Sequence, residues 1–183
     1  MRLYRQTVED FGLYTGCELT PKELAKLKEA AGAMSAKMRA VRIVAASSVS
    51  RKDLEQRLVQ KGEDPKQARD AVHWMEELNL VDDRKTAEQI IHSCIRKGYG
   101  LGRAKQALYE KRIPKEYWEE ALADYPDQMD AIIAYLEAHL SDAKDGKAVK
   151  KAVDALMRRG HSYSSIRKGL ERISVETEDF PEG

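Results

Sequence analysis

Apolar residues recur every three and four positions along nearly the whole chain after residue 20, and this is the period of one face of an α-helix. No long segment alternates apolar and polar residues with period two, so strands are not expected. The pattern therefore predicts an all-α body. Helices are expected at residues 21–32, 35–48, 51–62, 65–79, 83–97, 101–112, 115–124, 127–141, 146–159 and 164–173.

The starts of several predicted helices carry capping residues. Thr20, Ser50 and Asp64 each precede a helical run and have an acidic or amide residue three positions later. Asp82 and Asp83 can cap the helix that follows them, where their charge also meets the positive end of the helix dipole. The competing interpretation of this pair is a metal or acid–base site, and capping explains it with fewer assumptions.

Three segments of the chain resemble one another. The strings LVQKG (58–62), LYEKR (108–112) and LMRRG (156–160) begin 50 and then 48 positions apart, and apolar residues follow each anchor leucine at offsets of 10, 14 and 17. These offsets describe one face of the next helix, and an apolar residue four positions before each anchor lies on the face of the helix before it. The apolar columns are Leu54, Ala104 and Ala152; Ala68, Trp118 and Ile166; Val72, Leu122 and Leu170; and Met75, Tyr125 and Ile173.

The self-similarity predicts three tandem three-helix repeats in an elongated curved array, plus an N-terminal helix. A unit of about 48 residues buries little surface alone, so neighbouring units must stack. For residues 4–19, a small extended flap and a mobile arm both remain open. The expected divisions are 1–34 (N-terminal arm and helix), 35–81, 82–125 and 126–174 (the repeats) and 175–183 (an acidic tail).

The composition narrows the class of protein. The net charge is +1, 34 % of residues are charged and 7 % are aromatic, which is typical of an aliphatic core under a mixed-charge surface. No apolar run is long enough to span a membrane and no secretory signal is seen, so we expect a cytoplasmic protein without a membrane partner. Two distant cysteines, Cys17 and Cys94, form no disulfide framework.

The residues offer little for catalysis or cofactor binding. Gly98, Gly100 and Gly102 superficially suggest a phosphate loop, but no strand precedes them and no Gly-Lys-Ser/Thr follows, so a turn between helices is favoured. No two histidines have metal-ligand spacing, and His73 and His161 are expected on helix surfaces or ends. No nucleophile comes with a recognisable base, so neither an enzyme nor a cofactor is predicted.

Basic residues concentrate on the middle helix of each repeat. They outnumber acidic residues by at least five in segments 37–61, 96–112 and 144–172. If the middle helices share one face, that face is a positive strip that could attract DNA phosphates or an acidic protein groove. The alternative is an ordinary solvated surface. The candidate binding residues are Arg57, Lys61, Arg96, Lys97, Arg103, Lys105, Lys111, Arg112, Lys150, Lys151, Arg158, Arg159 and Lys168.

Aromatic residues could stack on nucleic-acid bases, but Trp118 and Tyr125 fall in the apolar columns of the repeat and are expected in the core. Trp74 lies outside the columns and is a candidate for an interface. For Tyr99, which lies between two glycines, a packing role and a contact role both remain open.

The central repeat also carries a family resemblance, in LVDDR (80–84), RKGYG (96–100), Arg103 and QALYEK (106–111). With these residues the chain resembles the RecX family, the regulators of the RecA recombinase, over about residues 35–173. One departure is Arg112, which stands where the family usually has a glycine. Arg112 must therefore either adopt a left-handed conformation at a cost or end its helix differently.

The resemblance implies a small, cofactor-free cytoplasmic protein, expected to be a monomer, that lies in the helical groove of the RecA filament. It would bridge RecA subunits, suppress ATP hydrolysis and strand exchange, and favour disassembly, meeting single-stranded DNA through the filament. An independent DNA-binding protein with tandem helix-turn-helix-like units is the alternative. A nuclease using Asp82 and Asp83 with a divalent cation is a third possibility, but a second acidic cluster is missing from the sequence.

Overall fold

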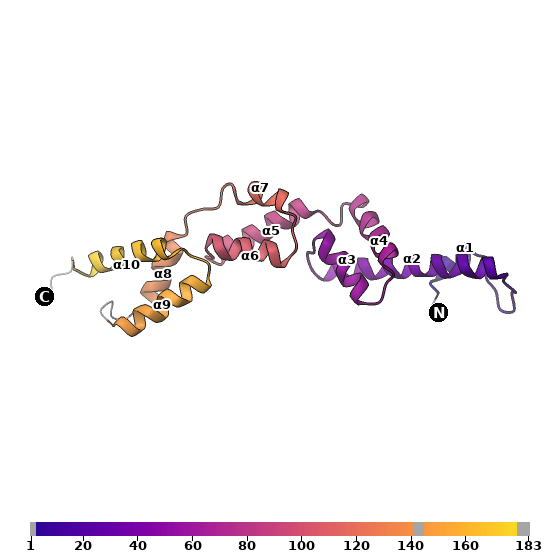
Figure 1. The fold of residues 1–183 in the computed structure, drawn as a ribbon, viewed down its shortest axis with the longest axis horizontal. Helices are drawn as coiled ribbons and strands as arrows, with labels where there is room; N and C mark the ends of the chain where they lie inside the picture. Colours follow the sequence, from indigo (N-terminus) through magenta and orange to yellow (C-terminus); the bar gives the residue numbers. More distant parts are fainter. Residues whose placement is uncertain (1–2, 141–144, 179–183) are drawn as a thin grey trace. The chain divides into compact units, whose positions relative to one another are not determined.

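The structure, a computed structural model, describes residues 3–140 and 145–178, and within these ranges it is helical without any strand. The prediction of an all-α fold is confirmed (Figure 1). The helices are α1 (Arg5–Asp10), α2 (Pro21–Ala46), α3 (Arg51–Gln60), α4 (Pro65–Glu77), α5 (Asp83–Arg96), α6 (Leu101–Glu110), the 3-10 turn η1 (Lys115–Tyr117), α7 (Trp118–Leu122), α8 (Met129–His139), α9 (Gly146–Arg158) and α10 (Tyr163–Glu178).

The chain forms two compact units, Met1–Thr86 and Ala87–Gly183. In the first unit, α2 packs against both α3 and α4. In the second unit, α8 packs against α9 and α10, and the chain before it forms α6, η1 and α7. The boundary between the units falls inside α5.

The first long helix differs from the prediction, because the expected helices 21–32 and 35–48 form one continuous α2. Gly32 lies at the end of the first of these predicted helices, and its missing side chain leaves room for a neighbouring side chain. A Cβ at this position would collide with the side-chain amide of Gln67, which donates to the carbonyl oxygen of Glu29 at 3.1 Å. Glycine thus leaves room for the Gln67 side chain of α4 against α2 without interrupting the helix.

The ends of the chain differ as well. Neither an extended flap nor a mobile arm describes residues 4–19 fully, because Arg5–Asp10 is helical and contacts α2. At the other end α10 continues to Glu178, past the predicted end at residue 173 and into the expected acidic tail. Residues 141–144, where the predicted helix 127–141 ends, and residues 179–183 of that tail lie outside the described residues.

Among the residues that the structure describes, three clusters of buried apolar residues form the interior, one in the first unit and two in the second. The anchor leucines Leu58, Leu108 and Leu156 are each fully buried, in a different cluster. Trp118 and Tyr125 pack against the second cluster, as predicted. The indole nitrogen of Trp118 donates to the carbonyl oxygen of Ile113 at 3.0 Å. The apolar columns read from the sequence therefore coincide with the buried interior.

Candidate interaction surface

The middle helices of the three repeats are α3, α6 and α9, and each ends in the same backbone turn. The amides of Gly62, Arg112 and Gly160 bond to the carbonyl three residues back at 2.9 Å in all three turns, and the next amide reaches the anchor leucine's carbonyl at 3.0 to 3.2 Å. This is the Schellman motif, which requires a left-handed residue. That residue has φ of 90° at Gly62, 56° at Arg112 and 86° at Gly160. Arg112 thus adopts the strained conformation rather than ending its helix differently.

The glycine-rich turn of residues 97–103 joins α5 to α6 and lies against the turn that follows α9. The amide of Gly100 donates to the carbonyl oxygen of Arg159 at 2.9 Å, and that of Gly102 donates to the carbonyl oxygen of Gly160 at 3.0 Å. A Cβ on Gly100 would meet the backbone of Gly160 well inside contact distance. These glycines serve close backbone packing within the second unit, which agrees with the predicted turn between helices.

Tyr99, at the centre of this turn, packs among aromatic and cationic groups. The Arg159 guanidinium lies 5.8 Å from the Tyr99 ring centroid and 5.2 Å from that of Tyr135, and the Lys97 ammonium lies 6.0 Å from Tyr99. The Tyr125 hydroxyl donates to the carbonyl oxygen of Tyr99 at 2.6 Å. Burial raises the pKa of Tyr125 to about 12. Packing is therefore the role of Tyr99 that these contacts support.

His161 follows the turn that ends α9. It was expected at a helix surface or end, and its side chain is buried. Its Nε2 lies 3.0 Å from the carbonyl oxygen of Gly98, to which the neutral ring can donate. Burial lowers the pKa of His161, and the nearby Arg159 lowers it further. His161 therefore joins the two turns as a neutral hydrogen-bond donor.

The candidate basic residues separate into two groups. Arg57 pairs with Asp53 at 2.9 Å and Arg103 with Glu110 at 2.9 Å, so their charges are partly neutralised inside the chain. Arg159 packs between two tyrosine rings, and Lys111 and Arg112 are half-buried. The exposed candidates, which an incoming partner can reach, are Lys61, Arg96, Lys97, Lys105, Lys150, Lys151, Arg158 and Lys168.

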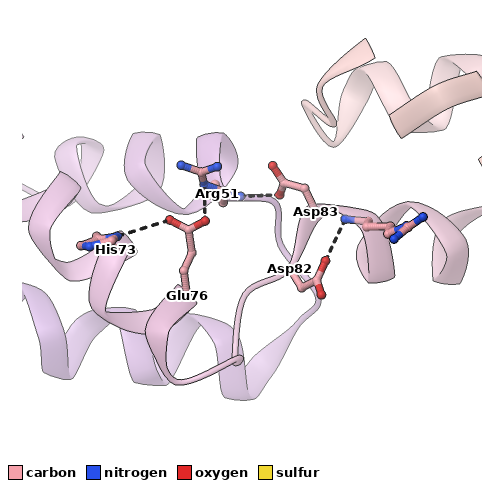
Figure 2. Close-up of polar contacts among 6 residues, drawn as sticks. Arg51, His73, Glu76, Asp82 and Asp83 are labelled. Carbon is pink, nitrogen blue, oxygen red and sulfur yellow. Dashed lines mark hydrogen bonds and ion pairs between the residues drawn. The ribbon is translucent and has the colours of Figure 1, made fainter. Parts of the chain in front are cut away.

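Asp82 and Asp83 have different partners (Figure 2). The Asp82 carboxylate accepts from the amides of Arg84 at 2.9 Å and Lys85 at 3.1 Å, so it caps α5 as predicted. Asp83 is buried and accepts from the amide of Arg51, the first residue of α3, at 2.8 Å. Sequence reasoning missed this second contact. The sequence did contain a hint of this contact. Asp82 alone is enough to cap α5, so the neighbouring Asp83 is available to bind another helix.

The pKa of Asp83 is raised, chiefly by burial, although the hydrogen bond from the Arg51 amide opposes the shift. The Arg51 side chain turns the other way and pairs with Glu76 at 2.7 Å, which Figure 2 also shows. Among the described residues, no group of three or more histidine, cysteine or acidic side chains could hold a metal ion. Within the same residues, every helix is too short or too polar to cross a bilayer.

Comparisons with known proteins agree with this arrangement. A family model described as the second three-helix domain of RecX matches residues 82–122. Regulatory protein RecX of Chlorobaculum tepidum is 30 % identical over 75 % of this chain and 87 % of its own length. Regulatory protein RecX of Vibrio parahaemolyticus is 29 % identical over 83 % of this chain and 98 % of its own.

Solved structures share the fold. A crystal structure of regulatory protein RecX aligns with a TM-score of 0.68 at 18 % identity, covering 91 % of this chain and 86 % of that one. The structure of RecX from Lactobacillus salivarius aligns with the same TM-score at 20 % identity, covering 80 % and 99 %. The fold thus defines an all-α helical repeat protein. With the sequence relatives, it shows that the chain belongs to the RecX family of regulatory proteins.

Proposed function

We propose that this protein regulates the RecA recombinase by lying in the helical groove of the RecA filament on single-stranded DNA. Binding that bridges neighbouring subunits suppresses ATP hydrolysis and strand exchange and favours filament disassembly. Membership of the RecX family is the observation that carries this proposal. The exposed lysines and arginines of the middle helices add support, because they offer repeated positive charge to an acidic groove or to DNA phosphates.

The mechanism requires no chemical step. A chain with several contacts gains affinity from each additional one, since later contacts form at the high effective concentration set by the first. Charged contacts mainly raise the rate and specificity of association. We therefore propose a monomeric cytoplasmic regulator without catalytic residues, metal or cofactor, which meets single-stranded DNA through the filament.

The direct test is the ATPase rate of RecA on single-stranded DNA during titration with this protein. A rate that falls to a low plateau is expected. An unchanged rate at saturating protein would contradict the proposal. The alternative of an independent DNA-binding protein predicts tight binding to naked DNA that weakens steeply with salt, with a log–log slope of about 0.9 per contacted phosphate.

A charge-reversal pair tests the basic residues separately from the fold. Lys105→Glu with Arg158→Glu changes two exposed charges of the middle helices α6 and α9. The matched control is Lys22→Glu with Lys26→Glu, which reverses two exposed lysines of α2. The first variant should weaken filament binding at an unchanged melting temperature, and the second should not. Equal weakening by both would mean that only net charge matters.

A further inference from the structure

The residue that follows each anchor leucine is apolar and exposed in all three repeats. Val59, Tyr109 and Met157 are 39 %, 72 % and 47 % exposed. Single exposed apolar residues are common on protein surfaces and need no explanation. Recurrence at one repeat position is different, because nothing in helix packing requires an apolar residue there. We call Val59, Tyr109 and Met157 the docking residues.

The backbone gives the docking residues a common local geometry. Each occupies the same place in a Schellman turn, and its carbonyl oxygen accepts the 2.9 Å bond from the left-handed residue of that turn. The preceding leucine is fully buried, and the next side chain is rotated about 100° around the helix, away from the core. Each repeat therefore projects its docking residue from equivalent backbone.

An exposed lysine precedes each docking residue on its own helix by one or two turns. Lys105 lies one turn before Tyr109, and Lys52 and Lys150 lie two turns before Val59 and Met157, respectively. Residues four or seven positions apart share a helix face. Acidic side chains share two of these faces, since Glu55 lies one turn before Val59 and Asp154 lies one turn before Met157. Each middle helix thus presents an exposed apolar side chain with charged groups around it, which is complementary to an apolar pocket with a polar rim.

These observations favour a protein over a nucleic acid as the occupant. Stacking on bases requires a flat ring or guanidinium, and only Tyr109 of the three docking residues has one. Valine and methionine instead fill apolar pockets in proteins, and methionine adapts well to irregular ones. One position repeated three times in this chain also fits a partner that presents the same surface repeatedly.

We propose that the three docking residues insert into equivalent apolar pockets on a filament of identical protein subunits. This inference rests on the proposed function, since RecA on single-stranded DNA is that filament, and it specifies which side chains make the contact. Each repeat contributes one apolar anchor.

The test compares two triple variants with matched exposure. The docking variant is Val59→Ser, Tyr109→Ser and Met157→Ser. The control is Leu24→Ser, Tyr14→Ser and Leu78→Ser, whose side chains are 38 %, 73 % and 48 % exposed in the native chain. Binding to RecA filaments and to naked single-stranded DNA is measured for both variants and for the native protein, with melting temperatures as a check of folding.

The docking variant should bind the filament at least about tenfold more weakly than the native protein, since buried apolar anchors dominate interface energies. The control should bind within about twofold of the native protein. Equal weakening by both variants, or by neither, would overturn the inference while the proposed function stands. A loss confined to naked DNA would make the occupant a nucleic acid and overturn it too. A native protein that does not bind the filament would overturn both proposals.

Discussion

The backbones of Gly100 and Gly160 are in direct contact, and neither position has room for a Cβ. Overpacking a close contact costs about 1–3 kcal/mol because the neighbouring backbone must move. Gly100→Ala should therefore lower the free energy of unfolding by about that amount, measured by urea denaturation. Gly146→Ala is the control, since a Cβ there meets nothing within 4 Å. It should leave stability unchanged or raise it by up to about 1 kcal/mol. Equal losses in the two variants would show that the contact between the turns is loose.

Arg112 holds a left-handed conformation at φ 56°, where the other two repeats have glycine. For a residue with a Cβ, this conformation costs roughly 1–2 kcal/mol. Arg112→Gly should raise the free energy of unfolding by about 1 kcal/mol, with part of the gain lost to the greater freedom of glycine in the unfolded chain. Gly62→Ala is the mirror experiment and should lower stability by a similar amount. A destabilised Arg112→Gly protein would show that the arginine side chain contributes more than its backbone costs.

His161 should make stability depend on pH. Its pKa is lowered in the folded protein, so between the folded value and the ordinary value of 6.5 the unfolded chain binds more protons. Stability is therefore fully present above about pH 6.5 and falls as the pH drops toward the folded pKa. His161→Gln, which keeps an amide donor, should flatten the stability curve in this window. Parallel stability curves for the native protein and His161→Gln would contradict this prediction.

Asp83 should make stability change with pH in the direction opposite to His161. Its pKa is raised above the ordinary value of 3.8, so protonation favours the folded state, and stability rises relative to Asp83→Asn as the pH falls through the raised value. At neutral pH the asparagine should be as stable as the native residue or up to about 1 kcal/mol more stable. The reason is that its amide oxygen can still accept from Arg51 without a buried charge. Urea denaturation of both proteins across the acid range checks this, and a difference that does not change with pH would exclude the shift.

Helical periodicity and capping chemistry are local properties, and they predicted most helices of this fold. The anchor leucines illustrate this, because their spacing alone identified positions that are fully buried. Contacts between segments far apart in the chain could not be predicted from these local patterns. The match of Gly100 to the Arg159 carbonyl, and of Gly32 to Gln67, depends on which turns and helices meet. A glycine in a sequence signals conformational freedom, but not the group that approaches it.

The candidate basic residues show the same contrast between predictable local position and unpredictable contacts. The sequence located Arg103 and Arg159 on or beside middle helices, but it could not show that Glu110 pairs with one and that tyrosine rings flank the other. Reversing these two charges is thus expected to cost stability. Exposure distinguishes Lys105 and Arg158 as candidates for contact with a partner. The charge-reversal pair Lys105→Glu with Arg158→Glu tests the proposal that these exposed residues contact the RecA filament.

The separate buried clusters have a consequence for cooperativity. The first lies in Met1–Thr86 and the other two lie in Ala87–Gly183, so the two units have different interiors. When nearest-neighbour contacts dominate, heat melts a chain in stages, and the van't Hoff enthalpy falls below the calorimetric one. Partial melting would then be a state of its own, in which one unit has lost its order while the other is still folded.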